Sequence, residues 1–225
     1  MSRTWIILLI VISLLVFMFW PNQEKPQQPA PDQIQMMPWD VEFSTTGNSI
    51  VMGLEIGRST PEDASEIFAR RGELALFADQ GGSLSAESFF SELTTGGLSG
   101  RIILNLELSK AELELMAKRS VKRKTMETGS IKYTPNREDR LKLLTLTIRS
   151  ITYIPYIDLD IDIIESRFGK PEQITQSSTG QTHLLYPARG MEVILDSVGK
   201  EVIQYVNRDD FSRLQKSLNK SVSSP

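Results

Sequence analysis

The sequence predicts an α+β fold of tandem units, each a short helix followed by an antiparallel meander, behind an N-terminal transmembrane helix. Three observations predict it: an apolar run at 5–20, a Pro/Gln-rich stretch without periodicity at 21–37, and a helix-and-strand pattern that recurs roughly 100 residues later. We therefore expect an anchor at 1–20, a linker at 21–37, a first unit at 38–129, a second unit at 130–208 and a C-terminal helix or tail at 209–225.

The run at 5–20 is the strongest signal. Ser13 is its only polar member, and twelve of its sixteen residues are Ile, Leu, Val or Phe. Such residues favour helix insertion by roughly 4 to 7 kcal/mol in total, and the tryptophans at both ends suit the two membrane interfaces. Arg3 precedes the run, which by the positive-inside rule leaves the N-terminus in the cytoplasm. The alternatives are a cleaved signal peptide, for which 21–25 offers no small-x-small site, and a buried helix.

Composition excludes several classes of protein. A net charge of -3 argues against a nucleic-acid binder, where a basic excess is expected. The absence of cysteine excludes disulfides, thiol nucleophiles, thiolate metal sites and a lipid-modified cysteine. His183 is the only histidine, so a histidine-rich metal site is excluded too.

The first unit is predicted to open with a hairpin that turns at 46–48. A helix then begins at Thr60, a capping residue followed by proline and two acids, which suit the first helical turn. Phe68 closes the apolar face of this helix. Strands are predicted at 89–93 and 98–108.

The second unit repeats this plan. Asp158 or Asp160 begins a short helix with Phe168 on its apolar face, and Gly-Lys-Pro at 169–171 ends it. Three strands follow, at 182–186, 191–195 and 201–206. Because Thr60 corresponds to Asp160 and Phe68 to Phe168, we expect a duplication in which both rings are buried at equivalent places.

A longer helix is predicted between the two units. Ser109 and Glu112 form a capping box at its start, and it ends around Lys124. Strands are predicted at 130–134 and 141–153. The end of this helix carries a cluster of five cations, Lys118, Arg119, Lys122, Arg123 and Lys124. The cluster has two interpretations: a solvated helix end that complements the dipole, or a surface that binds anionic lipids or a polyanionic partner.

Three segments of the second unit resemble a known family: Ser-Arg-Phe-Gly-Lys-Pro-Glu at 166–172, Gly-Met-Glu-Val-Ile-Leu-Asp at 190–196, and Gly-Lys-Glu-Val at 199–202. They are similar to the SmpA/OmlA-type (BamE-like) small envelope domains, mainly over 158–206, with a weaker second copy at 54–108. The resemblance implies a short helix, a Gly-x-Pro turn, a small antiparallel sheet, and a scaffold that binds other envelope proteins. The chain departs from the family in having no lipoprotein cysteine.

The chemical motifs are incomplete. The D-x-D-x-D triplet at 158–162 lacks the glycine and glutamate of a calcium loop, since Ile163 and Phe168 stand there. The S-x-x-K spacing at 217–220 lacks its companion elements. His183 lies in an alternating strand, at the surface or half buried, without a nucleophile elbow. The sequence therefore predicts no catalytic, cofactor or metal site. Capping of a helix explains the acids, and a weak divalent-ion site is the alternative interpretation.

We therefore expect an interaction or scaffold protein of the bacterial cell envelope. The run at 5–20 would cross the inner membrane once and leave the folded region in the periplasm, where its partners would be other envelope proteins. No nucleic acid is expected among them. The alternative is an envelope enzyme or enzyme regulator that acts on cell-wall polymer through carboxylates dispersed in the sequence.

Overall fold

The computed structural model describes residues 37–95, 97–177, 180–196, 199–212 and 214. The chain divides into two units, residues 1–33 and 34–225, and all described residues belong to the second. The predicted anchor at 1–20 lies outside the described residues, as do nearly all of the linker and most of the C-terminal tail. Among the described residues, no helix is long and apolar enough to cross a membrane.

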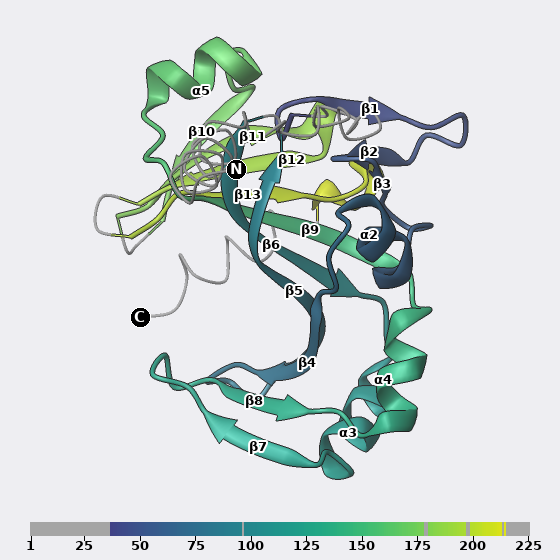
Figure 1. The fold of residues 1–225 in the computed structure, drawn as a ribbon. Helices are drawn as coiled ribbons and strands as arrows, with labels where there is room; N and C mark the ends of the chain where they lie inside the picture. The colour runs from purple at the N-terminus through teal and green to yellow at the C-terminus, as the bar shows by residue number, and fades with distance from the viewer. Residues whose placement is uncertain (1–36, 96, 178–179, 197–198, 213, 215–225) are drawn as a thin grey trace, which may run out of the picture. The chain divides into compact units, whose positions relative to one another are not determined.

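The described part of the chain is built on one ten-stranded antiparallel sheet (Figure 1). Its strands, in spatial order, are β10 (Gln173–Gln176), β11 (Thr182–Tyr186), β12 (Met191–Leu195), β13 (Val202–Tyr205), β9 (Ile148–Pro155), β6 (Leu98–Leu106), β5 (Leu84–Thr95), β4 (Glu73–Ala78), β8 (Ile131–Thr134) and β7 (Lys122–Thr125). A second, three-stranded sheet contains β1 (Val41–Phe43), β2 (Ser49–Val51) and β3 (Leu54–Glu55).

The predicted fold class is wrong. Two separate meanders were expected in tandem, but β9 pairs with β6 along one edge and with β13 along the other. The two meanders are therefore halves of one sheet, and a single large core cluster runs beneath both. The described structure is mostly antiparallel sheet with four helices, not a pair of tandem helix-and-meander units.

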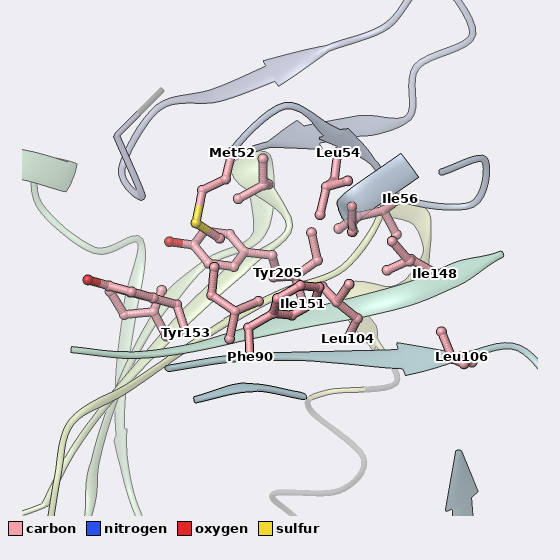
Figure 2. Packing of buried hydrophobic residues seen from close by; sticks show 14 of the residues in the cluster. Met52, Leu54, Ile56, Phe90, Leu104, Leu106, Ile148, Ile151, Tyr153 and Tyr205 are labelled. Atoms are coloured by element: carbon pink, nitrogen blue, oxygen red, sulfur yellow. The ribbon is translucent and has the colours of Figure 1, made fainter. Parts of the chain in front are cut away.

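One face of the large sheet carries this core. Side chains alternate along a strand, so Ile102 and Leu104 of β6 and Ile151 of β9 point the same way, and all three are fully buried. Figure 2 shows Met52, from the turn between β2 and β3, and Leu54 of β3 on the side of the sheet where Leu104 and Ile151 lie, and all four belong to one core cluster. Each of the four described α-helices adds a buried residue to the same cluster: Ala64, Met116, Leu143 and Phe168.

Three predicted helix starts are confirmed. Helix α2 (Pro61–Ile67) begins after Thr60 with a full capping box, as does α3 (Lys110–Lys118) after Ser109. Helix α5 (Ile161–Phe168) is capped by Asp160, whose side chain accepts the backbone N–H of Ile163 at 2.7 Å. These starts are encoded within three or four residues, which is why the sequence alone places them.

Helix α4 (Arg137–Leu144) lies where a strand was predicted from residue 141 onward. The apolar residues at 144, 146 and 148 alternate as they would in a strand, but they straddle the end of this helix and the start of β9. The missed signal is Asn136, whose side chain accepts the backbone N–H of Asp139 at 2.9 Å and caps the helix.

The end of α3 also differs from the prediction. The helix stops at Lys118 with Arg119 as its cap, and Lys122–Lys124 belong to strand β7. Strand β7 pairs with β8 through a hairpin that contains Gly129 at φ +81°, a conformation that favours glycine. Pairing of β7 with β8 thus overrides the helical conformation that was predicted for residues 119–124.

The two expected equivalents, Phe68 and Phe168, have different surroundings. The Phe168 ring is 3% exposed and lies 6.3 Å from the Trp39 ring and 6.2 Å from the Tyr186 ring. Phe68 is only half buried, with its ring 5.2 Å from that of Phe90. The expectation that both rings are buried at equivalent places is therefore wrong.

Phe168→Ala should lower the free energy of unfolding by about 3 to 5 kcal/mol, because it leaves a cavity between α5 and the sheet. Ile174→Ala is the control: Ile174 is 52% exposed at the edge strand β10 and should change stability by about 0.5 kcal/mol or less. Denaturant unfolding of both variants measures the difference. Similar losses in the two would contradict the placement of the Phe168 ring.

Candidate functional site

Strand β7 forms one open edge of the large sheet. It pairs with β8 on one side, and no described strand lies on its other side. All four of its residues are exposed, and Val121 just before it is 68% exposed. An exposed edge strand presents unpaired backbone donors and acceptors, so it is a potential binding surface for another strand.

The hairpin hydrogen bonds show which backbone groups face the open side. Met126 donates its N–H to the carbonyl of Ser130 at 2.8 Å, and Gly129 donates to the carbonyl of Met126 at 3.0 Å. Backbone groups of an antiparallel strand point alternately to its two sides. Arg123 and Thr125, an odd number of residues before Met126, therefore direct their N–H and C=O groups away from β8.

The structure divides the predicted cation cluster in two. Arg119 donates through Nε to Oδ2 of Asp139 at 2.8 Å, and its second bond reaches Oδ1 of the same carboxylate. Asp139 is 1% exposed, and its hydrogen bond raises the pKa of Arg119 above the usual value. Arg119 thus joins α3 to α4 and has a structural role. Sequence analysis missed Asp139 because it lies 20 residues further along the chain.

The other four cations are Lys118, Lys122, Arg123 and Lys124, here named the cationic edge. Among the described residues, no carboxylate lies within 4.0 Å of any of their charged atoms. Neighbouring Lys132, in contrast, pairs with Glu73 at 2.7 Å. Arg123 lies 5.9 Å from the centre of the Tyr133 ring. The cationic edge therefore carries positive charge that the described part of the fold does not neutralise.

His183 is buried, which corrects its expected place at or near the surface. It is 4% exposed, and its Nδ1 lies 2.6 Å from Oε1 of Glu192, which is 2% exposed. Its Nε2 is buried and has no hydrogen-bond partner among the described residues. The pair links β11 to β12 on the face of the sheet opposite the main core, where Leu185 and Phe211 form a small apolar cluster. These contacts support a structural role for both residues.

The aspartate triplet does not converge on one site. Asp160 caps α5, and Asp158 lies 2.5 Å from Nζ of Lys200. Asp162 lies in the first turn of α5. No group of three or more His, Cys, Asp or Glu side chains among the described residues could hold a metal ion. The S-x-x-K segment at 217–220 lies outside the described residues.

The structure also contains an open pocket of about 310 Å³ at the turn between β4 and β5, lined by Phe77, Asp79, Ser83, Leu84, Ser85, Glu87 and Ser130. Burial raises the pKa of Glu87, and a 2.8 Å hydrogen bond from the Ser85 hydroxyl partly opposes this. Asp79 accepts the backbone N–H of Ser83 at 2.7 Å, which gives it a role in the turn. Sequence analysis did not find this pocket, because nothing local distinguishes Glu87 from a solvated strand acid.

No family model, curated protein or solved structure compared with this chain gave a match. The resemblance of residues 158–206 to the SmpA/OmlA-type domains therefore remains a prediction. The assignment of function rests on the geometry of the described residues.

Glu87→Gln should stabilise the protein at neutral pH but not in acid. A carboxyl whose pKa is raised on folding binds protons more strongly in the folded state, so stability falls as pH rises from its unfolded to its folded pKa. The neutral amide removes this loss. Melting temperatures of wild type and variant should coincide below about pH 4, near the unfolded pKa, and diverge towards pH 7 in favour of the variant. A constant difference across this range would contradict the assigned cause.

Proposed function

We propose that this chain is an interaction protein of the bacterial cell envelope, which binds another envelope protein through the cationic edge. One observation carries the proposal: four exposed cations without a described acidic partner lie at or beside an open strand of the sheet. Exposed charges of one sign favour and steer the approach of a partner of opposite sign. Because the whole chain has a net charge of -3, this positive surface is local.

Attachment to the inner membrane is part of the proposal and rests on the sequence of 5–20. The Pro/Gln-rich residues at 21–37 follow directly, and a fully extended stretch of that length reaches about 50 Å at 3.1 Å per residue. A domain on such a linker could meet partners well away from the bilayer while its anchor stays in place. The domain would lie in the periplasm.

An envelope enzyme, or a regulator of one, acting on cell-wall polymer is the second candidate. The pocket at the β4–β5 turn favours it, because Asp79 and Glu87 both line that pocket. The pocket is open, and Asp79 already serves the turn. The cationic edge therefore supports a binding role more directly than the pocket supports catalysis.

The proposed location predicts the activity of a fused reporter domain and the behaviour of the protein on membrane extraction. A reporter that works only outside the cytoplasm, fused after Pro225, should be active, and the full-length protein should stay with the membrane pellet after alkaline carbonate extraction. The reason is the apolar run at 5–20, which favours stable insertion with the C-terminal side outside. An inactive reporter, or a soluble product trimmed at its N-terminus, would overturn the proposed attachment.

The proposed surface predicts a site-resolved cross-link. A photo-crosslinking residue in place of Val121 should form adducts with envelope proteins in intact cells, because Val121 is exposed directly beside β7. Reversal of Lys122, Arg123 and Lys124 to Glu should reduce the adducts several-fold, and each substitution should change stability by only about 0.5 kcal/mol. Arg119 is left intact because it pairs with Asp139.

The matched control reverses Arg71, Arg149 and Lys170, which are also exposed, so the net charge changes equally. This control should keep the adducts formed from position 121. A melting curve on each variant checks that the fold persists. Equal adduct yields from wild type and from the β7 reversal would contradict the proposed function.

A further inference from the structure

We infer that the open side of β7 takes up an acidic, extended segment of the partner protein as an additional strand of the sheet. The inference rests on the proposed function, since it names the binding mode and partner chemistry of the same edge. It accounts for two independent features: the direction of the backbone groups of Arg123 and Thr125, and the unneutralised charge of the cationic edge.

The backbone supplies the pairing groups. Arg123 and Thr125 each direct one N–H and one C=O away from β8, which is the alternating pattern that an added strand requires. In strand addition, main-chain hydrogen bonds supply the affinity and side chains supply the selectivity. Pairing with β8 keeps β7 extended before the partner binds. Strand β7 therefore loses little conformational entropy on binding.

The side chains select an acidic segment. Lys122 and Lys124 lie on one face of the sheet and Arg123 on the other, because neighbouring residues of a strand alternate. An incoming strand therefore meets cations on both of its faces. Acidic residues directly opposite a cation stabilise a strand pair, and basic residues destabilise it. Lys118, at the end of α3, is a further exposed cation four residues before β7 in the chain.

Other occupants fit less well. A second copy of this chain would bring two cationic β7 strands against each other, and like charges directly opposite are unfavourable. A membrane surface could neutralise the charge, but it offers no strand to pair with the groups of Arg123 and Thr125. Lysine on an edge strand can also serve only to prevent aggregation. One lysine is enough for that purpose, whereas β7 carries three consecutive cations.

The test uses the purified full-length protein and two fluorescent peptides of equal charge. One alternates Glu with Val, and the other has Pro at every Val position. When Glu lies opposite Lys122 and Lys124, Val lies opposite Arg123 and Thr125, so the N–H groups of the Val positions are the ones that pair. Proline lacks this N–H, whereas the Glu residues of the second peptide keep the charge. The Glu-Val peptide should bind in an anisotropy titration at low salt, and the Glu-Pro peptide should bind at least about tenfold more weakly, since several backbone bonds are lost.

Two substitutions of Thr125 test the backbone hydrogen bonds that β7 itself would make to the added strand. Thr125→Pro retains all the cations but removes an outward N–H, a change that edge strands tolerate when that group faces solvent. It should weaken Glu-Val binding on the order of tenfold, because one hydrogen bond and the fit of the strand are lost. Thr125→Ala keeps the N–H and should bind like wild type. If Thr125→Pro does not fold, the comparison of the two peptides on wild type decides.

The outcomes separate this inference from the proposed function. Equal binding of both peptides, lost on reversal of Lys122, Arg123 and Lys124, would show a charged surface without strand addition and would overturn this inference alone. The apolar run at 5–20 would itself insert into vesicles, so vesicle binding counts only where it requires the cations of β7. Binding of neither peptide, with sedimentation on anionic phospholipid vesicles that falls on reversal of Lys122, Arg123 and Lys124, would point to the membrane and overturn both. Binding of neither peptide, with vesicle sedimentation that the reversal leaves unchanged, would leave β7 as a protected edge and overturn this inference, and the cross-link from position 121 then decides the proposed function separately.

Discussion

Pairing of β9 along both of its edges holds the described domain together. Its contact with β6 is close: a Cβ atom on Gly100 would lie 2.4 Å from the Tyr153 ring and 2.7 Å from the carbonyl of Ile154, so a larger residue does not fit. On the other side, Tyr153 of β9 pairs with Ile203 of β13. Tyr153 is 1% exposed, so this central strand contributes both backbone pairing and core packing.

The small sheet depends on the same strand. The backbone N–H of Gly57 donates to the carbonyl of Ile148 at 2.7 Å, and Ile148 donates back to Ser59 at 2.8 Å. Ser49 reaches the other half of the domain, since its N–H donates to Oδ1 of Asn207 at 2.9 Å. These bonds place β1–β3 over the main core. Because β9 unites the two meanders, only the outermost strands, β10 and β7, remain as open edges of the described sheet.

How much the sequence predicts depends on how far apart the interacting residues lie. The caps at Thr60, Ser109 and Asp160 involve neighbours three residues away, and all three were found. Strands β11 and β12 were placed correctly because short turn-forming segments bound their alternating residues. The merger of both meanders through β9 depends on pairs about 50 residues apart, such as Ile203 with Tyr153. No local pattern records such a register.

The features of the candidate site were likewise predictable only where they depend on residues close in the sequence. The sequence identified all five cations, but it could not show that Arg119 has a buried partner in Asp139 or that Lys122–Lys124 lie on an edge strand. Both facts depend on tertiary pairing, of α3 with α4 and of β7 with β8. Strands β4 and β10 were missed too, since the apolar residues of β4 are continuous rather than alternating and β10 contains a single apolar residue, Ile174.

Arg119 and its neighbours in the cation cluster differ in whether they have an acidic partner, and this difference distinguishes a structural role from a binding role. A cation that stabilises the fold is expected to have an acidic partner, and Arg119 has a buried one. Three adjacent cations on a short exposed strand repel one another, and no described carboxylate within 4.0 Å compensates them. Folding alone therefore gives no reason for this arrangement. A partner that supplies acids while it pairs with β7 would supply one, because it would neutralise the charge and satisfy the open backbone groups together.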